Sequence, residues 1–279
     1  MISTLDELSR LLTTAFAITS LLSMGLSLTV SQIIEPLLNL RRVLLALVAS
    51  FVVVPAVAFA LASILPLELD QRIALVLFAM VAGSPLVPKL TEIAKGDVPF
   101  AVGLVAVLVA STLIYVSVVL PPLLPDAHVD TLAIAQPLFL QLLLPLFFGL
   151  LVRARSEEEA GWLQPIAAEI ASTSLTFLLV ITLLQHIGTV LGLLLSWAFV
   201  AILLLIAVAL VVGYLLGGPE RGGRVALALG TGQRNYAAAL VLGAGSFANR
   251  PEVLVVVAAA SVVSLFVMLL LAGELGRRA

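Results

Sequence analysis

Two cationic side chains interrupt long apolar stretches of this chain, and each stands beside residues that break helices. Lys89 follows the segment 83–88, GSPLVP, and Arg234 lies within the segment 230–235, GTGQRN. On insertion scales, a charged side chain at the centre of a bilayer costs about 2.5–3.5 kcal/mol. Broken spans that carry a charge at corresponding places are the pattern expected of a transporter's binding site.

The composition places the chain in a membrane. It is 62% hydrophobic and 11% charged, whereas a soluble domain is nearer one quarter charged. Apolar runs of about 20 residues recur along the sequence, and each is long enough to cross a hydrocarbon core of about 30 Å. The sequence has no cysteine, which excludes disulfides, thiolate metal sites and cysteine nucleophiles. We therefore expect an all-α polytopic membrane protein, embedded in the lipid bilayer, with no affinity for nucleic acid.

Charge clusters, prolines and glycines divide the chain into nine predicted transmembrane helices joined by short connections. The longest polar connection runs from Arg153 to Trp162 and is expected to be a solvated loop containing three consecutive glutamates. No connection is long enough for a separate domain, so residues 1–279 form one transmembrane transporter domain. The expected spans are 9–33, 43–65, 72–95, 98–120, 131–152, 163–187, 190–216, 224–247 and 252–273.

Positive charges predict the orientation, because cytoplasmic connections are enriched in Lys and Arg. Nine of the fourteen cations fall in alternate connections and at the C-terminus, which predicts an N-terminus outside and a C-terminus in the cytoplasm of the cell (inner) membrane. These nine are Arg41, Arg42, Lys95, Arg153, Arg155, Arg221, Arg224, Arg277 and Arg278.

The two broken spans, 72–95 and 224–247, would then be antiparallel and five spans apart. This relation is typical of inverted repeats in transporters. The first half-repeat would be residues 1–122 and the second residues 131–279, with one extra helix at the start of the second half.

The first break is predicted from its prolines. Pro85 and Pro88 lack backbone donors, so the helix should open after Gly83 and Ser84, with free carbonyl groups facing a cavity. The helix should restart near Pro88 with Lys89, Leu90 and Thr91 at its N-terminus. A helix N-terminus together with an ammonium group suits an anion.

In the second break, Gly230 and Gly232 permit a similar opening. Arg234 offers a planar fork that matches a carboxylate, sulfonate or phosphate group. Thr231, Gln233 and Asn235 are its nearby polar neighbours, and all four are candidate substrate-binding residues.

A structural role for the two cations is the alternative. Lys89 can pair with Glu92 one turn later, and Arg234 can pair with Glu169 of the span 163–187. Glu169 and Glu92 are also the candidate carboxylates for proton coupling. No metal-ligand spacing, phosphate loop or catalytic constellation is present in the sequence, so we expect no cofactor and no enzyme. His128 and His186 are predicted at membrane interfaces, as are Trp162 and Trp197.

Three stretches of the chain resemble the bile acid:sodium symporter family. Residues 24–28, MGLSL, are similar to the end of the family's first span. Residues 91–98, TEIAKGDV, are similar to the segment after its first crossover, and residues 232–235, GQRN, to its second crossover. The resemblance implies a panel domain and a core domain whose two broken helices cross, in the nine-helix form.

The same resemblance shows departures at the family's sodium ligands. Its crossover Glu falls at Gly230 and its Gln at Arg234, while Asn235 is retained. Hard cations such as sodium need oxygen ligands, and this sequence lacks most of the side chains that supply them in the family. The remaining family ligands fall at Val87, Pro88, Ala101, Val105 and Ser50.

We therefore expect a secondary transporter of a small or amphipathic organic anion, working by alternating access. Lys89 and Arg234 would stand where relatives bind sodium, which makes sodium dependence doubtful. One alternative is a sodium-coupled organic anion or bile acid symporter that uses Asn235, Thr91 and Ser84. Another is a non-transporting membrane receptor or scaffold.

Overall fold

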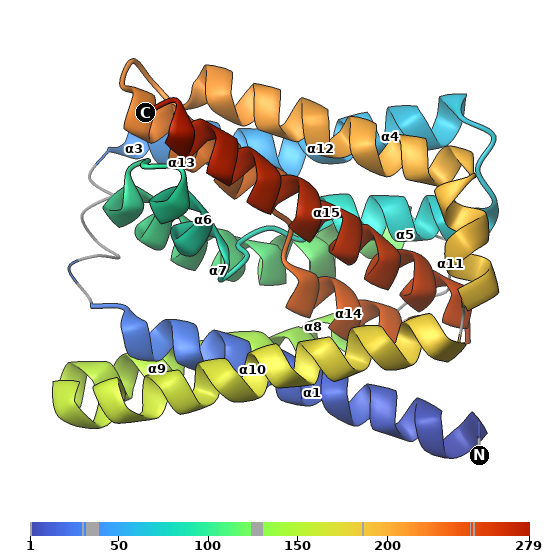
Figure 1. The fold of residues 1–279 in the computed structure, drawn as a ribbon, viewed down its shortest axis with the longest axis horizontal. Coiled ribbons are helices and arrows are strands. Elements are labelled where there is room, and N and C mark those ends of the chain that lie inside the picture. The colour runs from blue at the N-terminus through green and yellow to red at the C-terminus, as the bar shows by residue number, and fades with distance from the viewer. Residues whose placement is uncertain are drawn as a thin grey trace.

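The computed structural model describes residues 2–29, 31, 39–123, 131–185, 187–245, 247 and 249–279, and over these ranges it contains helices and no strand (Figure 1). His128 and His186 lie outside the described residues. The helices are α1 (Ile2–Ser27), α3 (Leu40–Val48), α4 (Val54–Ile64), α5 (Leu69–Met80), α6 (Val87–Ile93), α7 (Val98–Leu123), α8 (Thr131–Leu138), α9 (Leu144–Arg155), α10 (Glu157–Gln185), α11 (Ile187–Leu194), α12 (Trp197–Leu216), α13 (Arg221–Gly232), α14 (Tyr236–Gly245) and α15 (Pro251–Arg277).

Two of the long helical rods contain a single wide π-helical turn. Residues Ala49–Val53 join α3 to α4, and residues Phe139–Leu143 join α8 to α9. A proline follows each wide turn as the second residue of the next helix, Pro55 in α4 and Pro145 in α9. Because proline lacks an N–H group and its ring crowds the preceding turn, the wider turn accommodates it without ending the rod.

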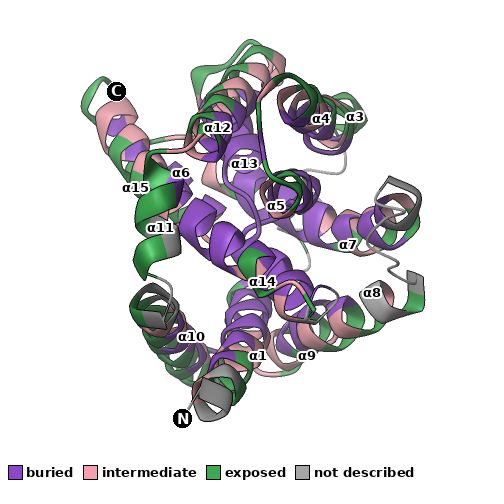
Figure 2. Cartoon of the chain, turned by 90° about the vertical axis from the view of Figure 1, so that its right-hand side faces the viewer, coloured by how far each residue is buried: buried purple, intermediate pink, exposed green. Residues whose placement is uncertain are grey.

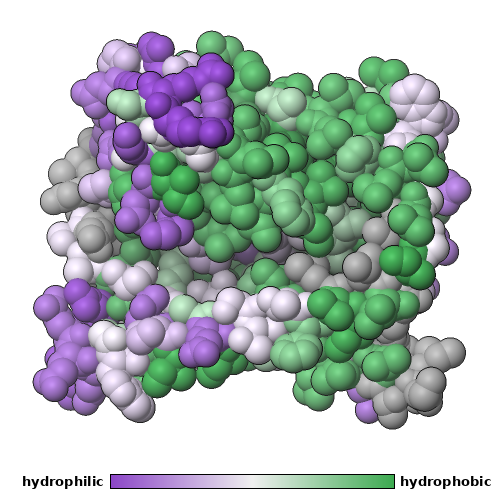
Figure 3. All heavy atoms as spheres, in the orientation of Figure 1, coloured by the Kyte–Doolittle hydropathy of each residue, from purple (hydrophilic) through white to green (hydrophobic). Residues whose placement is uncertain are grey.

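Six helices of the described chain are long and apolar enough to cross a membrane. The face in Figure 3 is hydrophobic over most of its middle, and hydrophilic residues gather at one end. The protein is an integral, multi-pass membrane protein. The six candidate spans are Glu7–Ser27, Leu40–Ile64, Val98–Leu120, Ala135–Arg155, Trp197–Leu216 and Pro251–Arg277.

The helices pack as an outer group against a buried centre. α1 lies along both α9 and α10 on one side of the molecule, while α4 and α12 lie on the opposite side (Figure 1). Between them run α5, α7, α13 and α14, whose residues are mostly buried, whereas α10 and α11 show largely exposed surfaces (Figure 2). This arrangement puts both broken helices in the middle of the bundle.

The contact between α1 and α9 depends on two glycines. A Cβ atom on Gly25 would collide with the carbonyl oxygen of Leu146, and one on Gly149 would lie 2.5 Å from the carbonyl oxygen of Leu22. Neither neighbour is the movable end of a side chain. The two backbones therefore touch directly, which makes α1 and α9 a rigid pair.

Two of the differences from the predicted spans have a clear local cause. The expected loop 153–162 is mostly helix, because α10 begins at Glu157 and the hydroxyl of Ser156 accepts from the amide of Glu159 at 3.2 Å. Carboxylates in a first turn favour a helix, since the N-terminal end carries partial positive charge. The expected span 190–216 is two helices, which separate at Ser196, where the hydroxyl caps the amide of Ala198.

Candidate functional site

Both broken spans are present in the structure. Residues 81–86 separate α5 from α6, and residues 233–235 separate α13 from α14. Gly83 has φ = +80°, and a Cβ atom there would lie 2.5 Å from the amide nitrogen of Val109. This position therefore requires glycine on two grounds. The predicted restart near Pro88 is confirmed, with α6 beginning at Val87 and Pro88 as its second residue.

The two breaks contact each other, and we call residues 81–86 and 233–235 together the crossover. The backbone amide of Asn235 donates to the carbonyl oxygen of Val81 at 3.3 Å, and its side-chain amide donates to that of Gly83 at 3.1 Å. The side-chain amide of Gln233 approaches the hydroxyl of Ser84 at 3.5 Å. These side chains are buried, so the hydrogen bonds satisfy groups that the broken helices leave without partners.

Arg234 is the largest fully buried side chain of the described residues, with 1% exposure. Its Nη1 donates to the carbonyl oxygen of Ala79 at 3.1 Å, and its Nη2 donates to that of Thr231 at 2.6 Å. Ala79 is the penultimate residue of α5, and Thr231 is the penultimate residue of α13. Carbonyl groups at helix C-termini carry partial negative charge, so one guanidinium group caps both broken helices.

The alternative pairing of Arg234 with Glu169 is not made. Glu169 lies on an exposed face of α10, and no ion pair of the described residues includes Arg234. Backbone carbonyl groups take the place of a carboxylate partner.

Lys89 is not buried in the crossover, contrary to its expected position beside Arg234. Its side chain is 70% exposed, and Nζ lies 2.8 Å from Oε2 of Glu92, which is 61% exposed. The reason is the phase of α6, whose buried face consists of Val87, Leu90 and Thr91. Lys89 and Glu92 lie three residues apart on the other face, so the predicted pairing of these two is made.

The start of α6 also differs from the expected set of free donors. The amide of Leu86 approaches the hydroxyl of Ser84 at 3.4 Å, and the amide of Val87 donates to the Ser84 carbonyl oxygen at 3.1 Å. Pro88 has no N–H group to offer. Ser84 therefore engages the donors that precede Pro88. Of the expected N-terminal residues Lys89, Leu90 and Thr91, the amide of Leu90 donates to the carbonyl oxygen of Leu86 at 3.0 Å.

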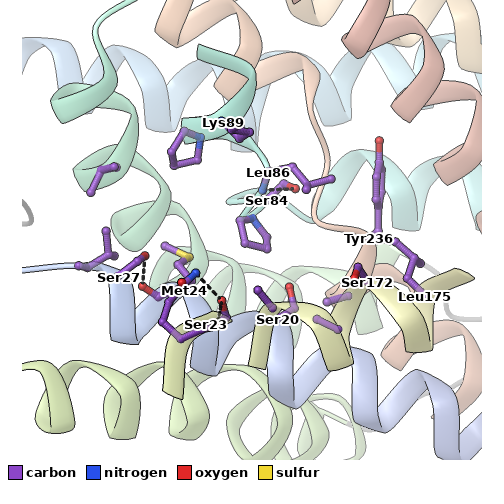
Figure 4. A pocket seen from close by; sticks show the side chains of 18 of the residues that line it. Ser20, Ser23, Met24, Ser27, Ser84, Leu86, Lys89, Ser172, Leu175 and Tyr236 are labelled. Atoms are coloured by element: carbon purple, nitrogen blue, oxygen red, sulfur yellow. Dashed lines mark hydrogen bonds between the residues drawn. The ribbon is translucent and has the colours of Figure 1, made fainter. Parts of the chain in front are cut away.

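A cleft of about 470 Å³ separates the crossover and α6 from α1 and α10. Figure 4 shows Ser84, Leu86 and Lys89 on one wall, with residues of α1 and α10 facing them. The remaining lining is mainly apolar. The polar and charged residues of the lining are Ser20, Ser23, Ser27, Ser84, Lys89, Glu92, Gln164, Ser172 and Tyr236.

The structure divides the predicted site residues into two groups. Ser84, Pro85, Pro88, Lys89 and Glu92 line the cleft. Glu169 belongs to neither group, because it is exposed on α10 and does not line the cleft. The others are buried in or beside the crossover and do not line the cleft: Gly83, Thr91, Gly230, Thr231, Gly232, Gln233, Arg234 and Asn235.

Sequence reasoning missed the polar wall that α1 and α10 contribute. The side-chain amide of Gln164 donates to the hydroxyl of Ser23 at 3.2 Å, which joins these two helices at the cleft. Ser20, Ser23 and Ser27 recur at intervals of three and four residues, the spacing of one helical face. That spacing was the signal that could have identified them.

A second hollow of about 590 Å³ lies between α7 and the α8–α9 rod. Among the described residues, its lining consists of Ala, Val, Leu and Phe only. Binding sites for small molecules combine apolar walls with a few polar groups that fix orientation, and this hollow lacks them. The first cleft is therefore the candidate site.

Comparison with protein families decides the relationship that these features suggest. Residues 15–191, well over half of the chain, match the model of the Sodium Bile acid symporter family. The chain belongs to this family. A comparison with curated protein sequences finds no match. The matched segment contains the first break and the cleft residues of α1, α6 and α10, whereas the second break and the lining residues Tyr236 and Ala237 lie beyond it.

The family name implies sodium, but the surroundings of Gly230, beside the crossover, do not fit an oxygen-coordinated cation. A Cβ atom on Gly230 would lie 2.9 Å from Cδ2 of Leu104 and 3.8 Å from Cγ1 of Val87. Ala101 and Val105 are fully buried nearby along α7. Na⁺ is a hard cation that requires oxygen ligands, and this surrounding is apolar.

Proposed function

We propose that this family member is a secondary transporter of a small or amphipathic organic anion, working by alternating access in the cell (inner) membrane. The observation that carries the proposal is the position of the cleft, between the crossover on one side and α1 with α10 on the other. A cleft between two helical groups is where substrate can be enclosed as one group rocks against the other. Its lining matches an amphipathic molecule, with apolar walls and a few polar groups.

The helix inventory supports a nine-span arrangement. The six apolar helices, the 29-residue α10 and the two broken pairs α5–α6 and α13–α14 account for nine crossings. With nine crossings, the two termini lie on opposite sides of the membrane, as the distribution of positive charge predicts.

The position of the cleft supports the proposal that the transporter is in its inward-open state. Its lining includes Ser27, at the end of α1, and Glu92, near the end of α6. The same end of the molecule carries Arg155 and Arg221, at the end of α9 and the start of α13 (Figure 1). Because such charges mark the cytoplasmic side, the cleft would open to the cytoplasm.

The position of the Arg234 guanidinium group supports transport that does not depend on sodium. In transporters with broken helices, the C-terminal ends of the half-helices attract a coupling cation. Here the guanidinium already lies at the ends of α5 and α13, bound to Ala79 and Thr231. A covalently attached cation needs no ion gradient to be retained. This role falls to Arg234 alone, since Lys89 faces the cleft.

Uptake of organic anions into proteoliposomes tests the proposal, with sodium replaced by an inert cation. Equal uptake in both media is the expected result. A steep dependence on sodium, with a Hill slope above one, would instead support a sodium symporter. Ligand binding without counterflow would support a receptor. One observation against the symporter alternative is that both polar atoms of the Asn235 side chain are already engaged, with Gly83 and Ala238.

A further inference from the structure

The charged part of the cleft is a closely spaced pair of opposite charges. Lys89 and Glu92 are the only charged residues among the described residues that line it. Their 2.8 Å contact leaves both side chains more than half exposed. The lining in this part of the chain therefore carries a local dipole and no net charge.

The opposite wall does not alter this balance. Its polar groups near the mouth are Ser23, Ser27 and Gln164, all uncharged. The hydroxyl of Ser27 donates to the carbonyl oxygen of Met24 at 2.7 Å, and Ser23 is bonded to Gln164. Arg234 is buried outside the cleft. A substrate therefore meets one cation and one anion, side by side.

We infer that the cleft selects an amphipathic zwitterion of the α-amino-acid type, whose carboxylate meets Lys89 and whose ammonium group meets Glu92. This inference rests on the proposed function, transport of a molecule that carries an anionic group, and it adds an ammonium group beside that anion, so that the substrate has no net charge. The apolar remainder of the molecule would lie against Met24, Leu86 and Leu175, which also line the cleft (Figure 4).

The electrostatic argument compares a single charge with a dipole. A lone carboxylate attracted to Lys89 is repelled by Glu92, and because the two groups are 2.8 Å apart the two effects largely cancel. A lone ammonium group meets the reverse situation. A zwitterion has a favourable contact with each group, so the two attractions add, and the wrong partners are rejected by repulsion.

The substrate can replace the existing contact between Lys89 and Glu92 at little cost in free energy. Exposed ion pairs contribute little to stability, because water competes with both partners. When a bound substrate displaces that water, its own charges replace it on Lys89 and Glu92. The pair then serves as a preformed receptor for a dipole.

Ligand-induced thermal stabilisation of the purified protein tests the inference with two sets of probes. One set is L-leucine, 4-methylpentanoate and 3-methylbutylamine, and the other is L-phenylalanine, 3-phenylpropanoate and 2-phenylethylamine. Each set keeps one apolar side chain and removes either the ammonium group or the carboxylate. We expect the zwitterion of at least one set to bind at least tenfold more tightly than its anion and its amine.

Single substitutions identify the residues responsible. Glu92→Gln should weaken the zwitterion at least tenfold and strengthen the matching anion, whereas Lys89→Gln should weaken both. The control is Glu274→Gln at the end of α15, because Glu274 pairs with Arg277 at the same spacing and the same 2.8 Å but lies outside the cleft. It should leave the preference unchanged.

The outcomes separate this inference from the function on which it rests. If the anions bind most tightly and Glu92→Gln changes nothing, the zwitterion inference is wrong and organic anion transport stands. If the amines bind most tightly, both are wrong. If no probe stabilises the protein, the zwitterion inference is wrong, and anion counterflow in proteoliposomes decides the function separately.

Discussion

The side-chain amide of Asn235 donates to the carbonyl oxygen of Gly83 over 3.1 Å and thereby ties the break of one helix to the break of another. The two residues are 152 positions apart in the chain. With the backbone bond from Asn235 to Val81, this contact fixes how the two broken helices cross. The crossover is therefore a structural unit as well as a candidate part of the transport mechanism.

Asn235→Ala should reduce the free energy of unfolding by about 1–3 kcal/mol, because the buried Gly83 carbonyl oxygen and the Ala238 amide each lose a partner. Denaturant unfolding in detergent measures the change. Ser63→Ala is the control, since this exposed hydroxyl bonds only to its own helix, at Phe59. An Asn235→Ala protein as stable as this control would show that the contact does not hold the crossover.

Gly83→Ala should destabilise the protein by at least about 2 kcal/mol, because alanine at φ = +80° is strained and its Cβ atom would approach the backbone of Val109. Gly161→Ala in α10 is the matched control, as nothing lies within 4 Å of a Cβ atom there. That control should gain about 0.5–1 kcal/mol from the better helix propensity of alanine. Equal effects of the two substitutions would contradict the described geometry of the break.

Arg234→Ala should cost about 3–5 kcal/mol, as expected for emptying a large buried side-chain site. Arg234→Met separates volume from charge, because it fills much of the same space without donating to Ala79 and Thr231. We expect Arg234→Met to recover part of the lost stability, with the remaining deficit reporting the two unpaired carbonyl groups. Unfolding free energies of the three proteins provide the comparison. Full recovery by methionine would show that the guanidinium contributes only bulk.

The breaks could be predicted from sequence because their causes are local. Pro85 and Pro88 remove backbone donors wherever the chain places them, and Gly83 permits a backbone conformation that other residues avoid. The location in a membrane could also be predicted, because the hydropathy of each segment depends only on its own residues.

The orientation of Lys89 was predictable in principle and was missed. Val87, Leu90 and Thr91 form a buried face at intervals of three and four residues, which leaves Lys89 and Glu92 on the other face. A cation in an apolar span suggests burial, but the phase of α6 places Lys89 on the exposed face of this helix.

The partners of Arg234 could not be predicted from the sequence. They are backbone carbonyl groups of Ala79 and Thr231, and every residue carries such a group. Only the tertiary arrangement brings the ends of α5 and α13 to one guanidinium. The sequence offers Glu169 as a complementary side chain, but Glu169 lies on an exposed face of α10, and Arg234 does not pair with it.

The direction in which the cleft opens can be tested with single cysteines, because the natural chain has none. Ser27→Cys places a thiol on an exposed position of the cleft lining, at the end of α1. A membrane-impermeant maleimide should label it in inside-out vesicles, and in right-side-out vesicles only after disruption of the membrane. Bound substrate should slow the labelling, since it occupies the same cleft.

Two further cysteines control this experiment. Ser63→Cys, at the opposite end of the molecule on α4, should be labelled from the outside (Figure 1). Ser261→Cys, which is 2% exposed in α15, should not be labelled from either side. Labelling of Ser27→Cys from the outside alone would reverse the assigned orientation. Labelling from both sides, at rates that substrate shifts in opposite directions, would be the direct signature of alternating access.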